Sequence, residues 1–132
     1  MGRVILDTSA AIAIERGRKS ALDALAGNET FLPAIVLAEL LTATWLASDD
    51  DTRQNRRRLT QTLEDLSHLL AFGDREAEIL AELRAHCFAT GAPRSESDLM
   101  IAAHAIAERA TLISTDRKAR FEQLPGLLVN YI

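Results

Sequence analysis

The hydrophobic pattern along the chain predicts short strands that alternate with helices. Short apolar runs rich in residues branched at Cβ favour buried strands. Such runs occur at residues 4–6, 29–32, 110–114 and 127–131, while residues 69–72 fit either a strand or the end of a helix. Strands separated by helices pair mostly in parallel, so the pattern predicts an α/β protein with a mostly parallel sheet covered on both faces.

Helical patterns fill the intervals between these strands. Residues 34–47 are apolar nearly all round, which predicts a helix that is buried on most sides. Pro33 suits the first turn of that helix. In the next helix, leucines at spacings of four, three and four form one apolar stripe. These leucines are Leu59, Leu63, Leu66 and Leu70.

The remaining helices are predicted from their start and stop signals. Thr8 and Ser9 are placed to cap a helix over residues 10–14, and Asp74 to cap one that runs to about residue 90. Gly27 and Asn28 end a helix around residues 21–26. A helix over residues 95–110 and a short one near 119–123 complete the pattern.

Length and composition fit one domain over residues 1–132. Hydrophobic residues make up 48% of the chain, enough for an aliphatic core, and aromatic residues only 5%. The net charge of −4 argues against a generally basic nucleic-acid-binding surface but leaves room for a local basic patch. Few aromatic residues also argue against a broad platform for base stacking.

The chain carries no sign of export or of a membrane span. Cys87 is the single cysteine, so no disulfide can form within the chain, which fits a reducing compartment. The start of the sequence lacks a long apolar segment behind basic residues. The longest run of low charge, residues 31–48, is too short and is interrupted by Glu39. We therefore expect a cytoplasmic protein without a membrane partner.

Two acidic residues directly follow predicted strands. Asp7 comes after residues 4–6, and Asp116 comes shortly after residues 110–114. Ligands of open α/β sheets bind at the carboxyl ends of the strands, which favours a functional role. The structural alternatives are that Asp7 caps the following helix or binds turn amides, and that Asp116 is a turn aspartate.

Two further acidic residues occupy unusual places on predicted helices. Glu39 is the only charge between Leu32 and Ala47, and an apolar setting is costly for a carboxylate without a partner. It is either held at a cleft by a cation or exposed along one stripe of the helix. Asp98 opens the helix after Ser95, and Ser95-x-x-Asp98 also resembles a capping box.

The four carboxylates are compatible with one site at the same edge of the sheet. Carboxylates that converge repel one another unless a cation neutralises them. Hard oxygen ligands without His or Cys suit Mg²⁺ or Mn²⁺. The commonest chemistry of such a site is phosphoryl transfer, in which the metal activates a water and stabilises the leaving oxygen.

Four spaced motifs run along the chain. They are Val4-Ile5-Leu6-Asp7-Thr8-Ser9, Pro33 followed by Glu39-Leu40, Asp98 followed by Ile101-Ala102-Ala103, and Leu112-Ile113-Ser114-Thr115-Asp116 followed by Phe121. These motifs resemble the PIN domain, and more specifically the VapC toxins of bacterial toxin–antitoxin pairs. The resemblance runs from Arg3 to Val129 with the motifs in the family's order.

This resemblance implies an α/β/α sandwich with a five-stranded sheet and an endoribonuclease that depends on Mg²⁺ or Mn²⁺. The family's acidic positions map onto Asp7, Glu39, Asp98 and Asp116, and its hydroxyl after the first Asp maps onto Ser9. One departure concerns Asp116, because the family often has Thr and then Asn or Asp after the fourth strand. Here Ser114-Thr115-Asp116 can be aligned in two registers one residue apart.

The resemblance also implies partners. These are a small VapB-like antitoxin whose tail crosses the active-site groove, a structured RNA substrate such as tRNA or rRNA, and a second copy in a homodimer. Among the basic residues, Arg117 and Lys118 beside Asp116 are candidates for holding RNA phosphates. Arg53 and Arg57 are further candidates, with a solvated helix face as the alternative.

Two other functions are compatible with parts of this pattern. A receiver-like signalling domain also has an Asp after a strand, but it needs an acidic pair after the first strand and an acid after the third. A catalytically inactive PIN-like module that binds protein or RNA is the other alternative. The presence of all the main acidic residues argues against an inactive module.

Overall fold

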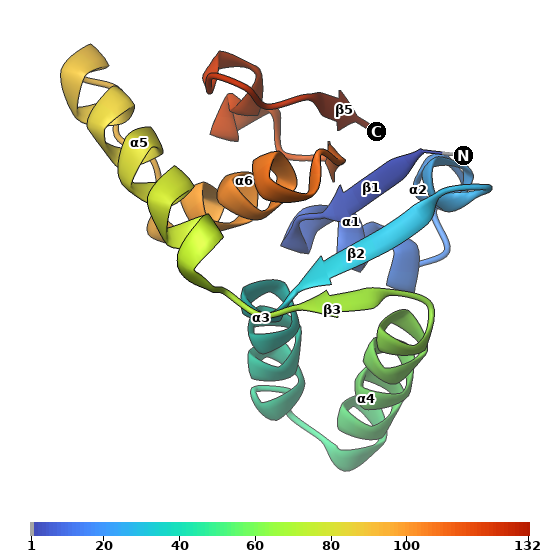
Figure 1. Cartoon of the computed structure of the whole chain (residues 1–132). Coiled ribbons are helices and arrows are strands. Elements are labelled where there is room, and N and C mark those ends of the chain that lie inside the picture. Colours follow the sequence, from blue (N-terminus) through green and yellow to red (C-terminus); the bar gives the residue numbers. More distant parts are fainter. Residues whose placement is uncertain (1) are drawn as a thin grey trace.

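The computed structural model describes residues 2–132 and has a single five-stranded sheet whose strands are all parallel (Figure 1). The strands lie in the order β3-β2-β1-β4-β5. Their bounds are Arg3–Leu6 for β1, Glu29–Pro33 for β2, His68–Leu70 for β3, Thr111–Ser114 for β4 and Val129–Tyr131 for β5. The parallel sheet predicted from the sequence is confirmed, and residues 69–72 contribute a strand.

Helices connect each strand to the next. They are α1 (Thr8–Glu15), α2 (Lys19–Leu25), α3 (Ala34–Trp45), α4 (Asp50–Asp65), α5 (Asp74–Thr90) and α6 (Glu96–Glu108). Helix α1 packs against α2, α3 and α4, whereas α5 packs against α6. Because crossovers between parallel strands are right-handed, α1–α4 and α5–α6 lie on opposite faces of the sheet. The result is the expected α/β/α sandwich.

The strand order decides against the receiver-like alternative. In that type of doubly wound sheet the strand order is 2-1-3-4-5. Here β1 is the central strand, with β2 on one side and β4 on the other. The central place of β1 puts the residue after Leu6 between the carboxyl ends of its two neighbours.

The core is aliphatic and is centred on β1 and β4. Ile5, Leu6, Leu112 and Ile113 are almost completely buried, and Phe121 packs into the same cluster. Each side chain of this kind contributes about 1.5–3 kcal/mol when it is fully buried. The two central strands are therefore a firm support for residues at their carboxyl ends.

Helix α3 is less buried than its composition predicts. Only Val36, Leu40 and Thr44 are buried, while Trp45 and Leu46 are 65% and 79% exposed. The prediction of a helix buried on most sides was wrong, because α3 and α4 form a pair that projects beyond the sheet (Figure 1). One side of this pair has no covering element in the described part of the chain.

The predicted leucine stripe after residue 53 is also interrupted. Leu63 is buried, but Leu66 is 64% exposed and Leu70 belongs to β3. Helix α4 ends at Asp65, since β3 must begin at His68 to pair with β2.

Several predicted helix ends differ by one or two residues. Pro33 ends β2 instead of lying in the first turn of α3, and Gly73 precedes α5 as its N-cap in place of Asp74. The carboxylate of Glu76 accepts a hydrogen bond from the Gly73 amide at 3.1 Å. Residues 117–123 form two short 3₁₀ helices, η1 (Arg117–Ala119) and η2 (Phe121–Gln123). Within residues 2–132, no helix is long and apolar enough to cross a membrane.

Candidate active site

Asp7 lies at the carboxyl end of the central strand and is held by three donors. Its Oδ1 accepts hydrogen bonds from Ser9 Oγ at 2.6 Å and from the Ala10 amide at 2.8 Å, and its Oδ2 accepts one from Ser114 Oγ. The bond to Ala10 makes Asp7 the N-cap of α1, a place that the sequence had assigned to Thr8 and Ser9. The capping alternative for Asp7 is therefore correct, and it does not by itself account for the burial of the carboxylate.

Burial raises the pKa of Asp7. The residue is only 4% exposed, and loss of water disfavours the charged carboxylate. The three hydrogen bonds lower the pKa and so oppose burial, while the charge of Asp116 raises it further. The carboxylate takes part in no ion pair of the described residues. Asp7 is thus oriented but not neutralised by the protein.

Glu39 projects from α3 toward the start of α1. Its Oε2 accepts a hydrogen bond from Thr8 Oγ1 at 3.0 Å, whereas its Oε1 is buried and has no hydrogen-bond partner among the described residues. A buried carboxylate oxygen without a partner is costly. Glu39 as a whole is half-buried, so its side chain is not simply exposed along one stripe of the helix, and its Oε1 is available to a cation.

Asp98 lies in the first turn of α6. Ser95 is the N-cap, and its Oγ accepts a hydrogen bond from the Asp98 amide at 3.2 Å, so the capping role predicted for Ser95 is confirmed. Burial raises the pKa of the Asp98 carboxyl, and the charges of Asp116, Asp7 and Glu39 raise it further. The charges of the other three carboxylates therefore reach the Asp98 carboxyl.

Asp116 is the most exposed of the four acidic residues. Its amide donates to Ser114 Oγ at 2.9 Å, and its Oδ1 accepts a hydrogen bond from the Lys118 amide at 3.1 Å. Asp116 thus caps η1, as the turn alternative predicted. Its charge still acts on both Asp7 and Asp98. Asp116 therefore lies at the margin of the acidic group.

The charges of the four acidic residues act on one another, but their side chains do not form a complete set of metal ligands. Among residues 2–132, no three acidic, His or Cys side chains lie close enough to hold a metal ion as they stand. Mg²⁺ usually keeps several waters and takes only one or two carboxylates directly. All the donors are hard oxygens, and Glu39 Oε1 lacks a partner. The site therefore fits a hydrated Mg²⁺ or Mn²⁺.

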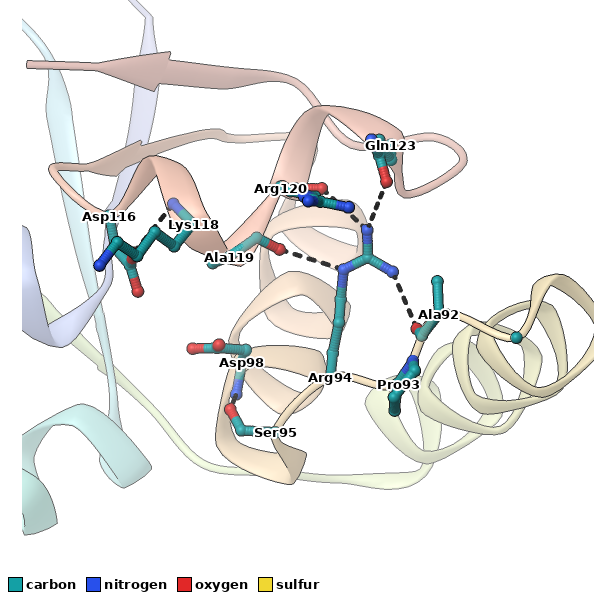
Figure 2. Close-up of a pocket in the computed structure, with 11 residues that line it drawn as sticks. Ala92, Pro93, Arg94, Ser95, Asp98, Asp116, Lys118, Ala119, Arg120 and Gln123 are labelled. Carbon is teal, nitrogen blue, oxygen red and sulfur yellow. Dashed lines mark hydrogen bonds between the residues drawn. The ribbon is translucent and has the colours of Figure 1, made fainter.

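A hollow of about 500 Å³ opens beside Asp98 and Asp116 (Figure 2). Lys118 and Arg120 also line it, as do Ser95 and Arg94. In the figure the carboxylates of Asp98 and Asp116 point into the space between α6 and η1. Asp98 and Asp116 are therefore accessible to a substrate from this side, whereas Asp7 and Glu39 do not line the hollow.

The predicted basic residues divide into two groups. Lys118 lines the hollow, and Arg117 stacks on Tyr131 with its guanidinium carbon 4.9 Å from the ring centroid. Arg53 and Arg57 lie on α4 and stack on Trp45 at 5.9 and 5.8 Å, and neither lines the hollow. Of these four basic residues, only Lys118 lines the hollow beside Asp98 and Asp116.

Three polar residues of this region were not predicted from the sequence as site residues. Ser114 holds Asp7 and Asp116 together, Thr8 binds Glu39, and Arg94 binds the segment after Asp116. The signal for Ser114 is its strand register, because Leu6 pairs with Ile113 and so puts Asp7 opposite Ser114. That signal requires knowledge that β1 and β4 are neighbours.

The fold and the acidic edge of the sheet together define a class of protein. The family model of the PIN domain matches residues 4–127. Ribonuclease VapC of Rickettsia bellii is 30% identical over 96% of this chain and 93% of its own length. Ribonuclease VapC2 of Rickettsia felis is 34% identical over 82% of this chain and 78% of its own length.

Solved structures give the same result. The VapBC2 structure from Rickettsia felis, bound to a promoter DNA fragment, matches with a TM-score of 0.87 and 25% identity over 98% of both chains. VapBC-5 from Mycobacterium tuberculosis matches with a TM-score of 0.83 and 26% identity over 100% of both chains. The chain belongs to the PIN domain family and, within it, to the VapC ribonucleases.

Proposed function

We propose that this chain is the ribonuclease toxin of a toxin–antitoxin pair and that it cleaves RNA with a divalent metal ion. The observation that carries the proposal is a group of carboxylates, buried at Asp7 and half-buried at Glu39 and Asp98, that form no ion pair with the described residues. Asp7, Glu39 and Asp98 would hold Mg²⁺ or Mn²⁺, with Asp116 at the margin. The whole chain, residues 1–132, would act as one domain in the cytoplasm.

The residues around the proposed metal site would orient its carboxylates and bind the RNA. Ser9, Ser114 and the Ala10 amide aim the Asp7 carboxylate, and Thr8 turns Glu39 so that its second oxygen stays free. When bound, the metal ion would activate a water and stabilise the leaving oxygen of the phosphodiester. Lys118 and Arg117 would hold phosphates of the RNA, such as tRNA or rRNA, next to these carboxylates.

The Asp7→Asn variant tests the catalytic assignment. It keeps the size of the side chain and the hydrogen bond from the Ala10 amide but removes the charge that would bind metal. We expect cleavage of cellular RNA in Mg²⁺ to fall by at least about 100-fold, with the circular dichroism spectrum unchanged. Asp51→Asn, at an exposed position on α4, is the control. Full activity of Asp7→Asn in Mg²⁺ would refute the assignment.

The neighbouring solved structures are named as VapBC complexes, which supports an antitoxin partner here. A groove of about 270 Å³ lies between α1, α3 and α4. Ile12, Leu40 and Leu59 give it apolar walls, and Glu15, Arg16 and Arg56 give it charges. We infer that the antitoxin tail lies along this groove and brings an Arg or Lys to the carboxylates in place of metal.

Expression in cells tests the toxin assignment separately from the nuclease assignment. We expect the chain alone to arrest growth, and the product of the small open reading frame beside its gene to relieve the arrest. Sequencing the new 5′ ends would identify the RNA. Growth arrest that no neighbouring gene relieves would remove the antitoxin claim and leave the nuclease claim intact.

A homodimer, which the resemblance implies, is tested by light scattering.

A further inference from the structure

We propose that Arg94 is a positioning residue that fixes Asp116 relative to Asp98. The inference rests on the proposed metal site and adds a residue that contacts neither the metal nor the RNA. Arg94 lies between the turn after α5 and the start of α6, and it is half-buried. Its side chain extends across the hollow to the segment that follows Asp116 (Figure 2).

The hydrogen bonds of Arg94 use every donor that its side chain has. A guanidinium carries five N–H groups and accepts no hydrogen bond. Nε donates to Ala119 O at 3.1 Å, Nη1 to Ala92 O at 3.4 Å and Cys87 Sγ at 3.5 Å, and Nη2 to Arg120 O at 3.0 Å and Gln123 Oε1 at 3.2 Å. No donor is left for a phosphate, so Arg94 has a different role from the one proposed for Lys118.

These bonds connect the two segments that carry Asp98 and Asp116. Arg94 precedes Asp98 by four residues, and Ser95 between them caps α6. In the second segment, the Asp116 carboxylate accepts a hydrogen bond from the Lys118 amide and so caps the start of η1. Arg94 holds the other end of η1 through the carbonyls of Ala119 and Arg120. The position of Asp116 relative to Asp98 therefore depends on Arg94 as well as on the bond from the Asp116 amide to Ser114.

The segment after Asp116 has little stability of its own. η1 and η2 are 3₁₀ helices of three residues each, a form with poor hydrogen-bond geometry. Arg120 between them has a φ of 52°, a left-handed conformation that costs a residue with a side chain about 1–2 kcal/mol. Its carbonyl is one of the groups that Arg94 binds. Phe121 is anchored in the core, so Arg94 is placed to hold the residues between Asp116 and Phe121.

The experiment measures Mn²⁺ binding by calorimetry for the full chain carrying Arg94→Ala, with and without Asp116→Asn. We expect Arg94→Ala to weaken Mn²⁺ binding about ten-fold, a typical effect of residues that orient metal ligands. In the Asp116→Asn background the same substitution should have no further effect, because the residue it positions is gone. Arg84→Ala is the matched control, since Arg84 is exposed and pairs with Glu96 near the same turn.

Hydrogen exchange gives a readout that does not depend on metal. The amides of Arg120, Gln123 and Leu124, which donate within the two 3₁₀ helices, should exchange faster in Arg94→Ala and remain protected in Arg84→Ala. Arg94→Lys should fall between wild type and Arg94→Ala, because an ammonium group has only three donors. It replaces Arg94→Ala in both measurements if the alanine variant does not fold.

Three outcomes would overturn the inference. Wild-type Mn²⁺ affinity and wild-type exchange in Arg94→Ala would show that the segment is held by other contacts. An equal loss of affinity with and without Asp116→Asn would show that Arg94 does not act through Asp116. Absence of Mn²⁺ binding by the wild-type chain would refute the proposed metal site as well, which distinguishes the two failures.

Discussion

At the scale of the residue, Asp7 combines a structural role with an unfavourable electrostatic position. Its carboxylate caps α1, which stabilises the helix by about 0.5–2 kcal/mol. The same carboxylate is buried without an ion-pair partner among the described residues, and burial raises its pKa. A cation bound at this edge would balance the buried charge of Asp7 and leave its capping of α1 unchanged.

The difference in stability between the Asp7→Asn variant and the wild type should therefore depend on pH. For a carboxyl with a raised folded pKa, the unfolded chain loses its proton first, so stability falls as pH rises through that pKa. The asparagine removes this loss. Without metal, we expect its advantage in free energy of unfolding to be greatest at neutral pH and to shrink toward pH ~4, the ordinary carboxyl range. Urea denaturation across this range tests this, and a pH-independent difference would contradict it.

Ser114→Ala should destabilise the protein more than its small size suggests. Ser114 is completely buried, donates to Asp7 and accepts from the Asp116 amide. Its loss leaves Asp7 Oδ2 and the Asp116 amide without these partners, at a cost of about 1–3 kcal/mol. Urea denaturation at neutral pH measures this difference. Ser20→Ala, exposed on α2, is the control and should change stability by less than about 0.5 kcal/mol.

At the scale of the element, α3 carries one acidic residue in an apolar sequence. The helix buries one face through Val36, Leu40 and Thr44 and leaves Trp45 largely exposed. Glu39 lies half-buried beside α1 and binds Thr8. Burial of its free oxygen works against stability, so the fold does not require a carboxylate at this position.

Glu39→Ala should accordingly be milder than the neighbouring core substitutions. It removes a desolvated carboxylate and one hydrogen bond, so we expect little change in free energy of unfolding. Leu40→Ala and Ile101→Ala remove buried side chains, 4% and 2% exposed, and should each cost about 2–5 kcal/mol. Thermal melts rank the three variants. If Glu39→Ala were the most damaging, Glu39 would be a structural residue.

At the scale of the whole molecule, the sheet separates two accessible regions. The hollow beside Asp98 and Asp116 lies between α6 and η1, whereas the groove proposed for the antitoxin lies between α1, α3 and α4. Asp98 and Asp116 line the hollow, and none of the four acidic residues lines the groove. Substitutions in the groove can therefore be made without changing the lining of the hollow.

Leu59→Glu should weaken antitoxin binding and spare RNA cleavage. Leu59 is half-buried in α4 and lines the groove, and it does not line the hollow next to Asp98. We expect the Kd for the antitoxin to rise at least ten-fold, about 1.4 kcal/mol, as measured by calorimetry. Leu128→Glu, at a position 70% exposed before β5, is the control. If Leu59→Glu weakened antitoxin binding no more than Leu128→Glu does, the antitoxin would not bind along this groove.

The sequence by itself determined the features that depend on local physics. Apolar runs located the strands near β1, β2, β4 and β5, and capping residues such as Ser95 located helix starts. The place of Asp7 directly after a strand, and of Glu39 alone in an apolar helix, identified two of the candidate metal-site residues. These inferences hold because strand and helix preferences act over a few neighbouring residues.

The tertiary structure decided what depends on neighbours far apart in the chain. Burial of α3 could not be derived from its composition, because exposure depends on which elements pack against it. Ser114 and Asp7 are 107 residues apart in the sequence, and Ser114 lies opposite Asp7 only because β4 pairs with β1. Arg94 reads as an ordinary turn residue until its five donors are seen to bind the segment after Asp116. Contacts of this kind are set by strand order and packing, which local patterns do not specify.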